Sequence, residues 1–166
     1  MNRTARIWLK HADYLVVPTT HSLNEADRIN RSAKKYMVPI SIDTDLFKFS
    51  SESRSQVREK INAKNKTVII YTGKCGGIYY SAEQVISFFK RLYYHQNNYF
   101  LFIITPNIEE ARVCLKNSGM PSDSFFLSDS VPYTELHKYL SAADIGLIAV
   151  PNLPSQKYRT PVKTGM

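Results

Sequence analysis

Cysteine is scarce in this sequence, and the two that occur, Cys75 and Cys114, lie in no Cys-x-x-Cys pair and have no matching Cys/His cluster. The sequence therefore argues against a disulfide framework or a structural zinc site and favours a reducing, cytoplasmic compartment. The four histidines are scattered without ligand spacing, so we expect no metal site. No apolar run approaches the roughly 20 residues of a membrane-spanning helix, and charged residues interrupt the opening segment where a signal peptide needs an apolar core.

Catalytic signatures are also missing. We find no Ser-His-Asp set, no paired carboxylates and no metal-binding motif, so the catalytic residues stay unassigned. Acidic residues number 14 against 22 Lys and Arg, which gives a net charge of +8. That excess favours an anionic partner such as a phosphate ligand, a nucleic acid or a membrane surface. Because the basic residues are dispersed and no nucleic-acid-binding motif is present, we expect no nucleic-acid partner.

The 166 residues suffice for one domain, or for one domain and a piece of another. Short apolar runs alternate with polar stretches of helical length, a pattern typical of a parallel sheet covered by helices. The runs are continuously apolar, which predicts strands buried on both faces. These strands are expected at 14–17, 67–71, 99–104, 124–127 and 145–150, with a candidate sixth at 37–42. The predicted fold class is α/β, with a Rossmann-like, doubly wound parallel sheet.

Helix-start signals precede three of the intervening segments. Ser22, Ser81 and Asn107 each stand three residues before an acid or an amide, the spacing of a capping box. Pro132 suits the first turn of a further helix. That helix would carry an apolar stripe toward the sheet, formed by Leu136, Tyr139, Leu140 and Ala143. The polar segment 50–66 predicts a linker followed by an exposed helix.

A glycine-rich loop, YTGKCGGIYY from Tyr71 to Tyr80, follows the predicted strand 67–71. Glycine allows the backbone to approach a ligand closely, and the N–H groups of such a loop can bind a diphosphate. Lys74 adds a mobile positive charge. The pattern is neither G-x-G-x-x-G nor a P-loop, so it indicates no dinucleotide or Walker-type site. A tight strand-to-helix turn without any ligand explains the loop equally well.

Cations and hydroxyls alternate in the last sixteen residues, which contain no acid. Both groups donate hydrogen bonds to phosphate oxygens, and ligands of open α/β sheets bind beyond the carboxyl ends of the strands. A solvated basic tail is the alternative. The residues concerned are Ser155, Lys157, Arg159, Thr160, Lys163 and Thr164. The loops 105–107 and 128–131 would frame a base or a sugar at the same edge, although turn chemistry alone also explains them.

Several segments match a known family in their order along the chain. The segment ADYLVVPTTHSLNEADRI is similar to the last strand and helix of the family's amino-terminal acceptor domain. The segment VPISIDTDLF is similar to P-N-G-V-D-x-x-x-F, the crossing between the family's two domains. VIIYTGKCGG resembles the first strand and glycine loop of a donor domain. The family pattern V-x-F-x-G-x-V…L-x-x-x-L-x-x-A-D-I-x-L resembles the segment FFLSDSVPYTELHKYLSAADIGLIAV. The pattern S-P-x-K-x-G-E resembles the later segment PSQKYRTPVKTG. On these segments the sequence resembles the carboxyl-terminal, nucleotide-sugar-binding half of retaining glycosyltransferases with the GT-B fold.

This resemblance implies that 1–37 is the tail of the acceptor domain and 38–166 a donor-binding domain truncated at its carboxyl end. It implies a hexosyltransferase-type parent enzyme in surface polysaccharide, lipopolysaccharide or glycoconjugate synthesis. A nucleoside diphosphate sugar is then the substrate, and no separate cofactor or metal is needed. The partners would be the nucleotide-sugar donor, a glycan or lipid-linked acceptor and, peripherally, the inner face of the membrane. The alternative is a non-catalytic α/β module that binds an anionic partner.

The resemblance also implies a set of donor-binding residues. Backbone N–H groups at Gly76 and Gly77, with Lys163 and Arg159, would stabilise charge on the departing diphosphate. The full set is Gly73, Lys74, Gly76, Gly77, Thr105, Ser128, Val131, Arg159, Thr160, Lys163 and Thr164.

The sequence departs from the family pattern at two places. Ile40 and Ser41 replace the asparagine and glycine of the crossing. Met166 stands where the family has a ribose-holding glutamate, and no acid follows Pro151. We therefore expect a truncated chain that binds donor but transfers no sugar by itself.

Overall fold

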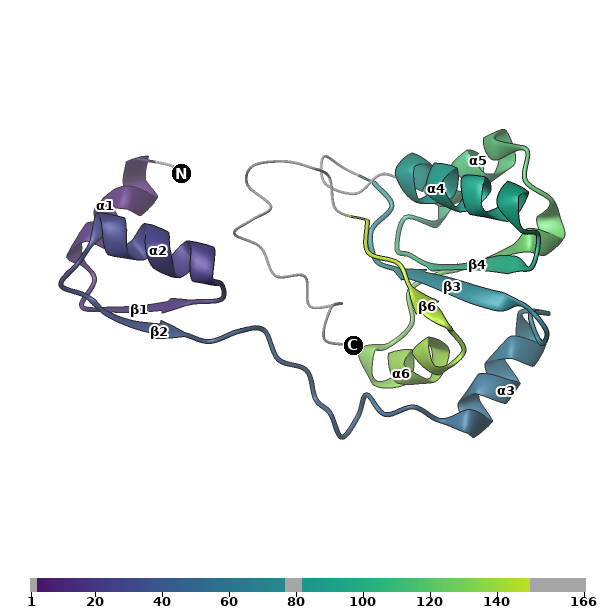
Figure 1. Cartoon of the computed structure of the whole chain (residues 1–166), viewed down its shortest axis with the longest axis horizontal. Coiled ribbons are helices and arrows are strands. Elements are labelled where there is room, and N and C mark those ends of the chain that lie inside the picture. The colour runs from purple at the N-terminus through teal and green to yellow at the C-terminus, as the bar shows by residue number, and fades with distance from the viewer. Residues whose placement is uncertain (1–2, 77–81, 150–166) are drawn as a thin grey trace. The chain divides into compact units, whose positions relative to one another are not determined.

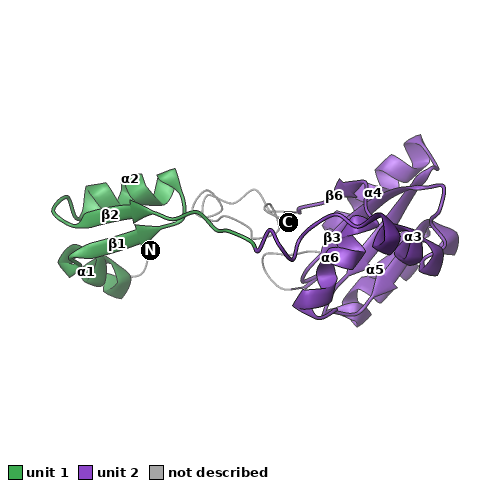
Figure 2. Ribbon diagram, turned by 90° about the horizontal axis from the view of Figure 1, so that it is seen from below, with its two compact units in different colours: residues 1–42, 152–166 green, residues 43–151 purple. Residues whose placement is uncertain are grey.

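The computed structural model describes residues 3–76 and 82–149 (Figure 1). The chain divides into two compact units, with the boundary between Ile42 and Asp43 (Figure 2). The predicted site residues Gly77, Arg159, Thr160, Lys163 and Thr164 lie outside the described residues, as do Ser81, Ser155 and Lys157.

The first unit contains helix α1 (Arg3–His11), strand β1 (Tyr14–Val17), helix α2 (Thr20–Ile29) and strand β2 (Lys34–Met37). The two strands are parallel, with Tyr14 opposite Lys34 and Val17 opposite Met37. The strand predicted at 14–17 is confirmed, whereas the candidate strand at 37–42 is wrong. The ladder ends where Val38 donates to the carbonyl of Val17, and Pro39 has no N–H with which to continue it.

Helix α2 begins three residues earlier than its capping signal predicted. Thr19 is the N-cap, and its side chain accepts a 3.0 Å hydrogen bond from the backbone N–H of Ser22. A capping box built on Ser22 is therefore wrong. Thr19 follows Pro18 with an extended backbone, the conformation that an N-cap residue requires.

The two-stranded sheet has one covered and one open face. Lys35 in β2 forms an ion pair of 3.0 Å with Asp27 of α2, on the face that α2 covers. On the other face Tyr14, Val16 and Tyr36 are more than half exposed, at 61%, 67% and 52%. Parallel sheets are usually buried on both faces. This small sheet therefore presents an apolar surface of the kind that a larger domain would cover.

The second unit is an α/β sandwich. Along the chain it contains α3 (Ser51–Lys60), β3 (Thr67–Thr72), α4 (Ala82–His95), β4 (Tyr99–Ile104), α5 (Ile108–Ser118), the short 3₁₀ helix η1 (Ser122–Ser124), β5 (Phe125–Ser128), α6 (Tyr133–Ser141) and β6 (Ile145–Gly146). The strands are all parallel in the order β5-β4-β3-β6. The predicted α/β class and parallel sheet are confirmed. The last strand is shorter than the predicted 145–150, because its pairing with β3 covers only Ile145 and Gly146.

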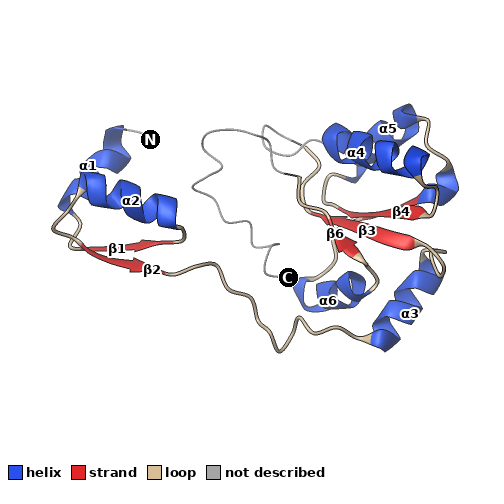
Figure 3. Ribbon diagram, viewed as in Figure 1, coloured by secondary structure: helices blue, strands red, loops and turns tan. Residues whose placement is uncertain are grey.

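Helices cover both faces of this sheet (Figure 3). Ile69, Tyr71, Leu101 and Ile103 pack on one face against α4 and α5. Val68, Ile70, Phe100, Phe102 and Ile104 pack on the other against α3 and α6, and the predicted stripe of α6 lies there. The helix predicted as exposed between 50 and 66 is partly buried instead, because Val57 and Arg58 of α3 enter this second core.

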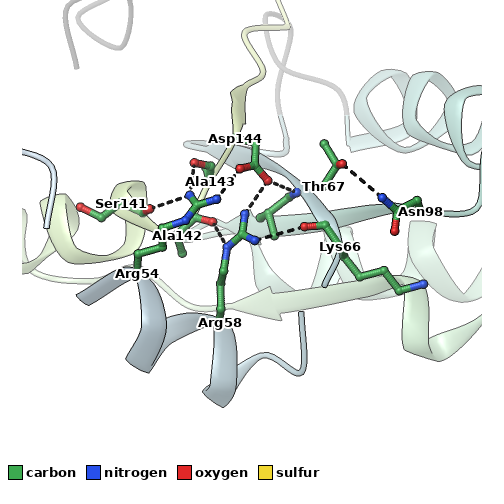
Figure 4. A network of polar contacts seen from close by, with 10 residues as sticks. Arg54, Arg58, Lys66, Thr67, Asn98, Ser141, Ala142, Ala143 and Asp144 are labelled. Carbon is green, nitrogen blue, oxygen red and sulfur yellow. Dashed lines mark hydrogen bonds and ion pairs between the residues drawn. The ribbon is translucent and has the colours of Figure 1, made fainter. Parts of the chain in front are cut away.

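A charged network closes the amino edge of the sheet (Figure 4). Asp144, between α6 and β6, accepts hydrogen bonds from Arg54, from Arg58 and from the backbone N–H of Val68. Arg58 also donates to the carbonyls of Ala142 and Lys66. Burial by itself raises the pKa of Asp144, but the hydrogen bonds from Arg54, Val68 and Arg58 outweigh it and hold that pKa below its ordinary value. The network thus joins α3, α6 and the start of β3.

Candidate functional site

The carboxyl ends of three parallel strands lie side by side, so the loops that follow them share one edge of the sheet. These loops begin after Thr72, Ile104 and Ser128. The N–H of Gly73 donates to the carbonyl of Ile104 at 2.9 Å, and the N–H of Thr105 donates to the carbonyl of Ser128 at 3.1 Å. Each loop is therefore joined to its neighbour by a backbone hydrogen bond. The structure thus brings together the three loops that contain the described donor-residue candidates Gly73, Lys74, Gly76, Thr105, Ser128 and Val131.

The first part of the glycine loop has a defined conformation. Gly73 has a φ of 130°, a backbone conformation open to glycine and strained for other residues. The hydroxyl of the buried Tyr71 donates to the carbonyl of Lys74 at 2.6 Å. Cys75 is 3% exposed, and its carbonyl accepts from the N–H of Ala82, which begins α4. Contacts with the core thus hold residues 71–75 of the loop in place.

Lys74 and Gly76 are two described residues of this loop that are accessible to solvent. Lys74 is exposed, and its ammonium has no hydrogen bond or ion pair with any residue of 3–76 or 82–149. A Cβ added at Gly76 would lie 3.4 Å from Nδ2 of Asn107 and 3.7 Å from Oε1 of Glu110. These are ordinary contact distances, so packing does not demand glycine at 76. Gly76 is half-buried, and the absence of a side chain allows a ligand to approach its backbone closely.

Asn107 connects the glycine loop to the loop after β4. Its Oδ1 accepts from the N–H of Cys75 at 3.3 Å, and its Nδ2 donates to Glu110 at 3.4 Å. Asn107 is the N-cap residue of α5, as its capping signal predicted, but its side chain accepts no hydrogen bond from the first turn of the helix. The predicted capping box is therefore wrong. The side chain bonds 32 residues away in sequence, and no local signal in the sequence indicated that role.

Thr105 was predicted as a ligand contact, and the structure assigns it another role. It is completely buried, and its Oγ1 accepts from the N–H of Asn107 at 3.1 Å. It therefore shapes the loop that carries Asn107 and presents no group to a ligand at the surface. Val131 is half-buried and packs against the second core, so its side chain is also engaged in packing. Ser128 is half-buried, and its hydroxyl donates to the carbonyl of Asp129.

The electrostatics of this edge are mixed. Lys74 supplies a positive charge, whereas Glu109 and Glu110 lie in the first turn of α5. Acids in that turn favour the helix through its dipole but repel an anion. Among residues 3–76 and 82–149, no three His, Cys, Asp or Glu side chains lie together in a way that could hold a metal ion. Helices in the same ranges are too short or too polar to span a bilayer.

Comparison with known proteins identifies the fold. No family model matches the chain, and no curated protein matches it by sequence. Solved structures do match. HepE from Anabaena, in complex with UDP and glucose, superposes with a TM-score of 0.66 over 87% of this chain at 13% identity. The HepE complex with UDP-glucose gives the same values. WaaG, a glycosyltransferase involved in lipopolysaccharide biosynthesis, matches over 82% of this chain with a TM-score of 0.64 and 15% identity.

The match covers only part of those proteins. This chain spans 40% of the HepE chain and 38% of the WaaG chain. At such low identities the likeness shows the fold and leaves the activity to be argued. The predicted fold is confirmed: this chain has the α/β architecture of a part of the glycosyltransferase structures that it matches, as expected for the carboxyl-terminal half of a GT-B fold.

Proposed function

We propose that the chain is the donor-binding part of a glycosyltransferase that moves a sugar from a nucleoside diphosphate sugar to an acceptor. The observation that carries this proposal is the joined set of loops at the carboxyl edge of the second unit's sheet. It includes Gly76, where a ligand can approach the backbone closely, and the ammonium of Lys74, which has no partner among the described residues. The same fold in HepE has been solved with UDP and with UDP-glucose, which supports a nucleotide sugar as the ligand.

The chemical demand of such a reaction is the negative charge that develops on the departing diphosphate. Fixed N–H donors and cations stabilise that charge when they are oriented before the reaction begins. Gly76 and Lys74 provide one of each from the glycine loop. In our proposal Gly77, Arg159 and Lys163 add further donors, and Thr160 and Thr164 add hydroxyls. This donor set works without a metal or a separate cofactor, so we propose that neither takes part.

The finer assignments also belong to the proposal. We propose a retaining hexosyltransferase of polysaccharide, lipopolysaccharide or glycoconjugate synthesis, acting on a glycan or lipid-linked acceptor in the cytoplasm. WaaG supports the pathway, and the absence of a disulfide at Cys75 and Cys114 supports the compartment. In our proposal the first unit is the end of an acceptor domain whose remaining strands would cover Tyr14, Val16 and Tyr36. Transfer requires both substrates at near-attack distance, so we expect this chain alone to bind donor without turnover.

Calorimetric titration of the chain with UDP and with UDP-glucose tests the donor site. Lys163→Ala should weaken UDP binding by about 1.5–3 kcal/mol, the contribution of a charge-assisted hydrogen bond. Lys116→Ala is the matched control, because Lys116 is an exposed lysine near the end of α5 and should leave the affinity unchanged. Equal affinities for the two variants would remove Lys163 from the site.

A second titration separates the proposal from a non-catalytic binding module. Binding of an oligonucleotide at physiological salt, with no response to UDP or UDP-glucose, would favour that module. Incubation of the chain with radiolabelled nucleotide sugars and a cell lysate as acceptor source tests turnover. Transfer of label by this chain alone would contradict the expectation that both domains are required.

A further inference from the structure

One acidic side chain lies beside the part of the glycine loop that would receive the diphosphate. Oε1 of Glu110 is 3.7 Å from the position that a Cβ at Gly76 would occupy. Glu110 is exposed, so a ligand that approaches the Gly76 backbone also comes within reach of its carboxylate. On the basis of the donor site proposed above, we propose that Glu110 is a specificity-determining residue. It favours a nucleoside diphosphate sugar over the free nucleoside diphosphate.

The helix that carries Glu110 does not use this carboxylate as a cap. Glu110 is the third residue of α5, and in a capping box a glutamate at that position accepts from the backbone N–H of the N-cap residue. Here the N–H of Asn107 donates to Oγ1 of Thr105 instead, at 3.1 Å. Within 3–76 and 82–149, Glu110 has one polar partner, Nδ2 of Asn107 at 3.4 Å. The carboxylate therefore remains able to meet a ligand.

Asn107 lies between the glycine loop and Glu110. Its Oδ1 accepts from the N–H of Cys75 at 3.3 Å, which joins Asn107 to the loop. Its Nδ2 is 3.4 Å from the Cβ position at Gly76 and donates to Glu110. The same amide thus contacts both, and the carboxylate of Glu110 lies on the side of α5 that faces the glycine loop.

The two ligands differ in the charge on their terminal phosphate. In a nucleotide sugar this phosphate is esterified to the sugar, whereas in a free nucleoside diphosphate it can lose a second proton, with a pKa of about 6. One additional unit charge about 5 Å from a carboxylate weakens binding about fourfold when water separates the two, and more when it does not. The sugar also brings hydroxyl groups, which donate to a carboxylate. Glu110 therefore repels the free diphosphate more than the donor.

Calorimetric titration of Glu110→Gln with UDP and with UDP-glucose tests this assignment. Glutamine removes the charge and retains a side-chain oxygen. The titrations are made at pH 8 without divalent cations, so that the terminal phosphate of UDP carries its second charge. We expect UDP to bind about fourfold more tightly to the variant than to the unmodified chain. Affinity for UDP-glucose should stay within about twofold, because lost repulsion and a weaker hydrogen-bond acceptor oppose each other.

Glu109→Gln is the matched control, because it removes the same charge from the same turn of α5. The carboxylate of Glu109 pairs with Arg112 at 3.5 Å, and it is not among the three atoms nearest to the Cβ position at Gly76. The ratio of the dissociation constants for UDP and UDP-glucose should therefore change by less than about 1.5-fold in this variant. Circular dichroism checks that both variants are folded.

Several results would overturn the assignment. Equal gains in affinity for the two ligands in Glu110→Gln would show repulsion of anions without selection, and equal losses would make Glu110 a counter-charge for a cation of the site. An equal change of the ratio in Glu109→Gln would show only an effect of helix charge. Each of these results leaves the donor site in place. If the unmodified chain bound neither UDP nor UDP-glucose, the proposed function itself would be refuted, and the assignment with it.

Discussion

Replacing Asp144 by asparagine should destabilise the second unit far more than an ordinary surface substitution does. The wild-type carboxylate accepts from two guanidinium groups and a backbone N–H. Asparagine retains one oxygen and loses the charge, so Arg58 would remain as a cation that is only 8% exposed and has no counter-charge. Removing one partner of a buried ion pair costs about 3–5 kcal/mol. Because the side chain of Asp144 is 30% exposed, we expect a smaller loss, about 2–4 kcal/mol.

Hydrogen exchange of β3 and β4 measures this loss where it occurs. The two units of the chain need not unfold together, so a single denaturation curve would mix their contributions. For core amides that exchange through global opening of the second unit, about 2–4 kcal/mol corresponds to exchange that is about 30- to 900-fold faster. Peptides spanning β3 and β4, analysed by mass spectrometry at neutral pH, would report the change.

Asp45→Asn is the matched control. Asp45 pairs with Lys48 at 2.8 Å, and its side chain is 92% exposed. An exposed pair of this kind contributes about 0–1 kcal/mol, so exchange in β3 and β4 should change by less than about fivefold. If Asp144→Asn and Asp45→Asn accelerated exchange equally, the network would be a surface feature without a part in stability.

Three further predictions concern stability and the donor loop. Because the pKa of Asp144 is lowered in the folded chain, the stability that its carboxylate contributes is complete above the ordinary value of 3.8 and is lost as pH falls through the folded value. The opening free energy of β3 and β4, measured by hydrogen exchange and corrected for the intrinsic exchange rate at each pH, should therefore fall less steeply below about pH 4 in Asp144→Asn. Gly119→Ala should cost about 1–2 kcal/mol, because Gly119 ends α5 with a φ of 69°, whereas Gly146→Ala in open space should be neutral or stabilising by the same hydrogen-exchange measurement. Asn107→Ala should speed hydrogen exchange of the Cys75 amide, because it removes the side-chain oxygen that accepts from this N–H. An unchanged exchange rate would show that the Asn107 side chain does not join the two loops.

The parts of the fold that were predictable from sequence are those that local chemistry decides. Strand β4 was predicted to the residue, because 99–104 is a continuous aromatic and β-branched run between polar turns. Strand β2 was missed because it begins with two lysines, and its extended conformation depends on pairing with β1. Pairing between distant segments is a tertiary effect that overrides local preference.

Long-range polar contacts could not be predicted from the sequence for the same reason. The helix at 51–60 has a polar sequence and was predicted as exposed, yet Arg58 is buried because its counter-charge lies 86 residues further along the chain. In the candidate site, the glycine loop and its neighbours were correctly brought to one edge by strand order alone. The exposure of each side chain could not be predicted, and Thr105 was therefore assigned to the ligand although it lies in the core.

The two edges of the second unit's sheet differ in their interactions, and this difference agrees with the donor site that we propose at the carboxyl edge. At the amino edge, Asp144 and two arginines join α3, α6 and β3 through charged hydrogen bonds. At the carboxyl edge, neutral hydrogen bonds join the loops, and the ammonium of Lys74 has no partner among the described residues. Unpaired donors cost little stability when exposed and remain available to a ligand, whereas pairing them within the fold would occupy the site. It follows that substitutions at Asp144 should reduce the folded fraction without changing the affinity of the folded protein for UDP. Substitution of Lys74 should do the reverse, and calorimetry on each variant at a temperature where it is folded would separate the two effects.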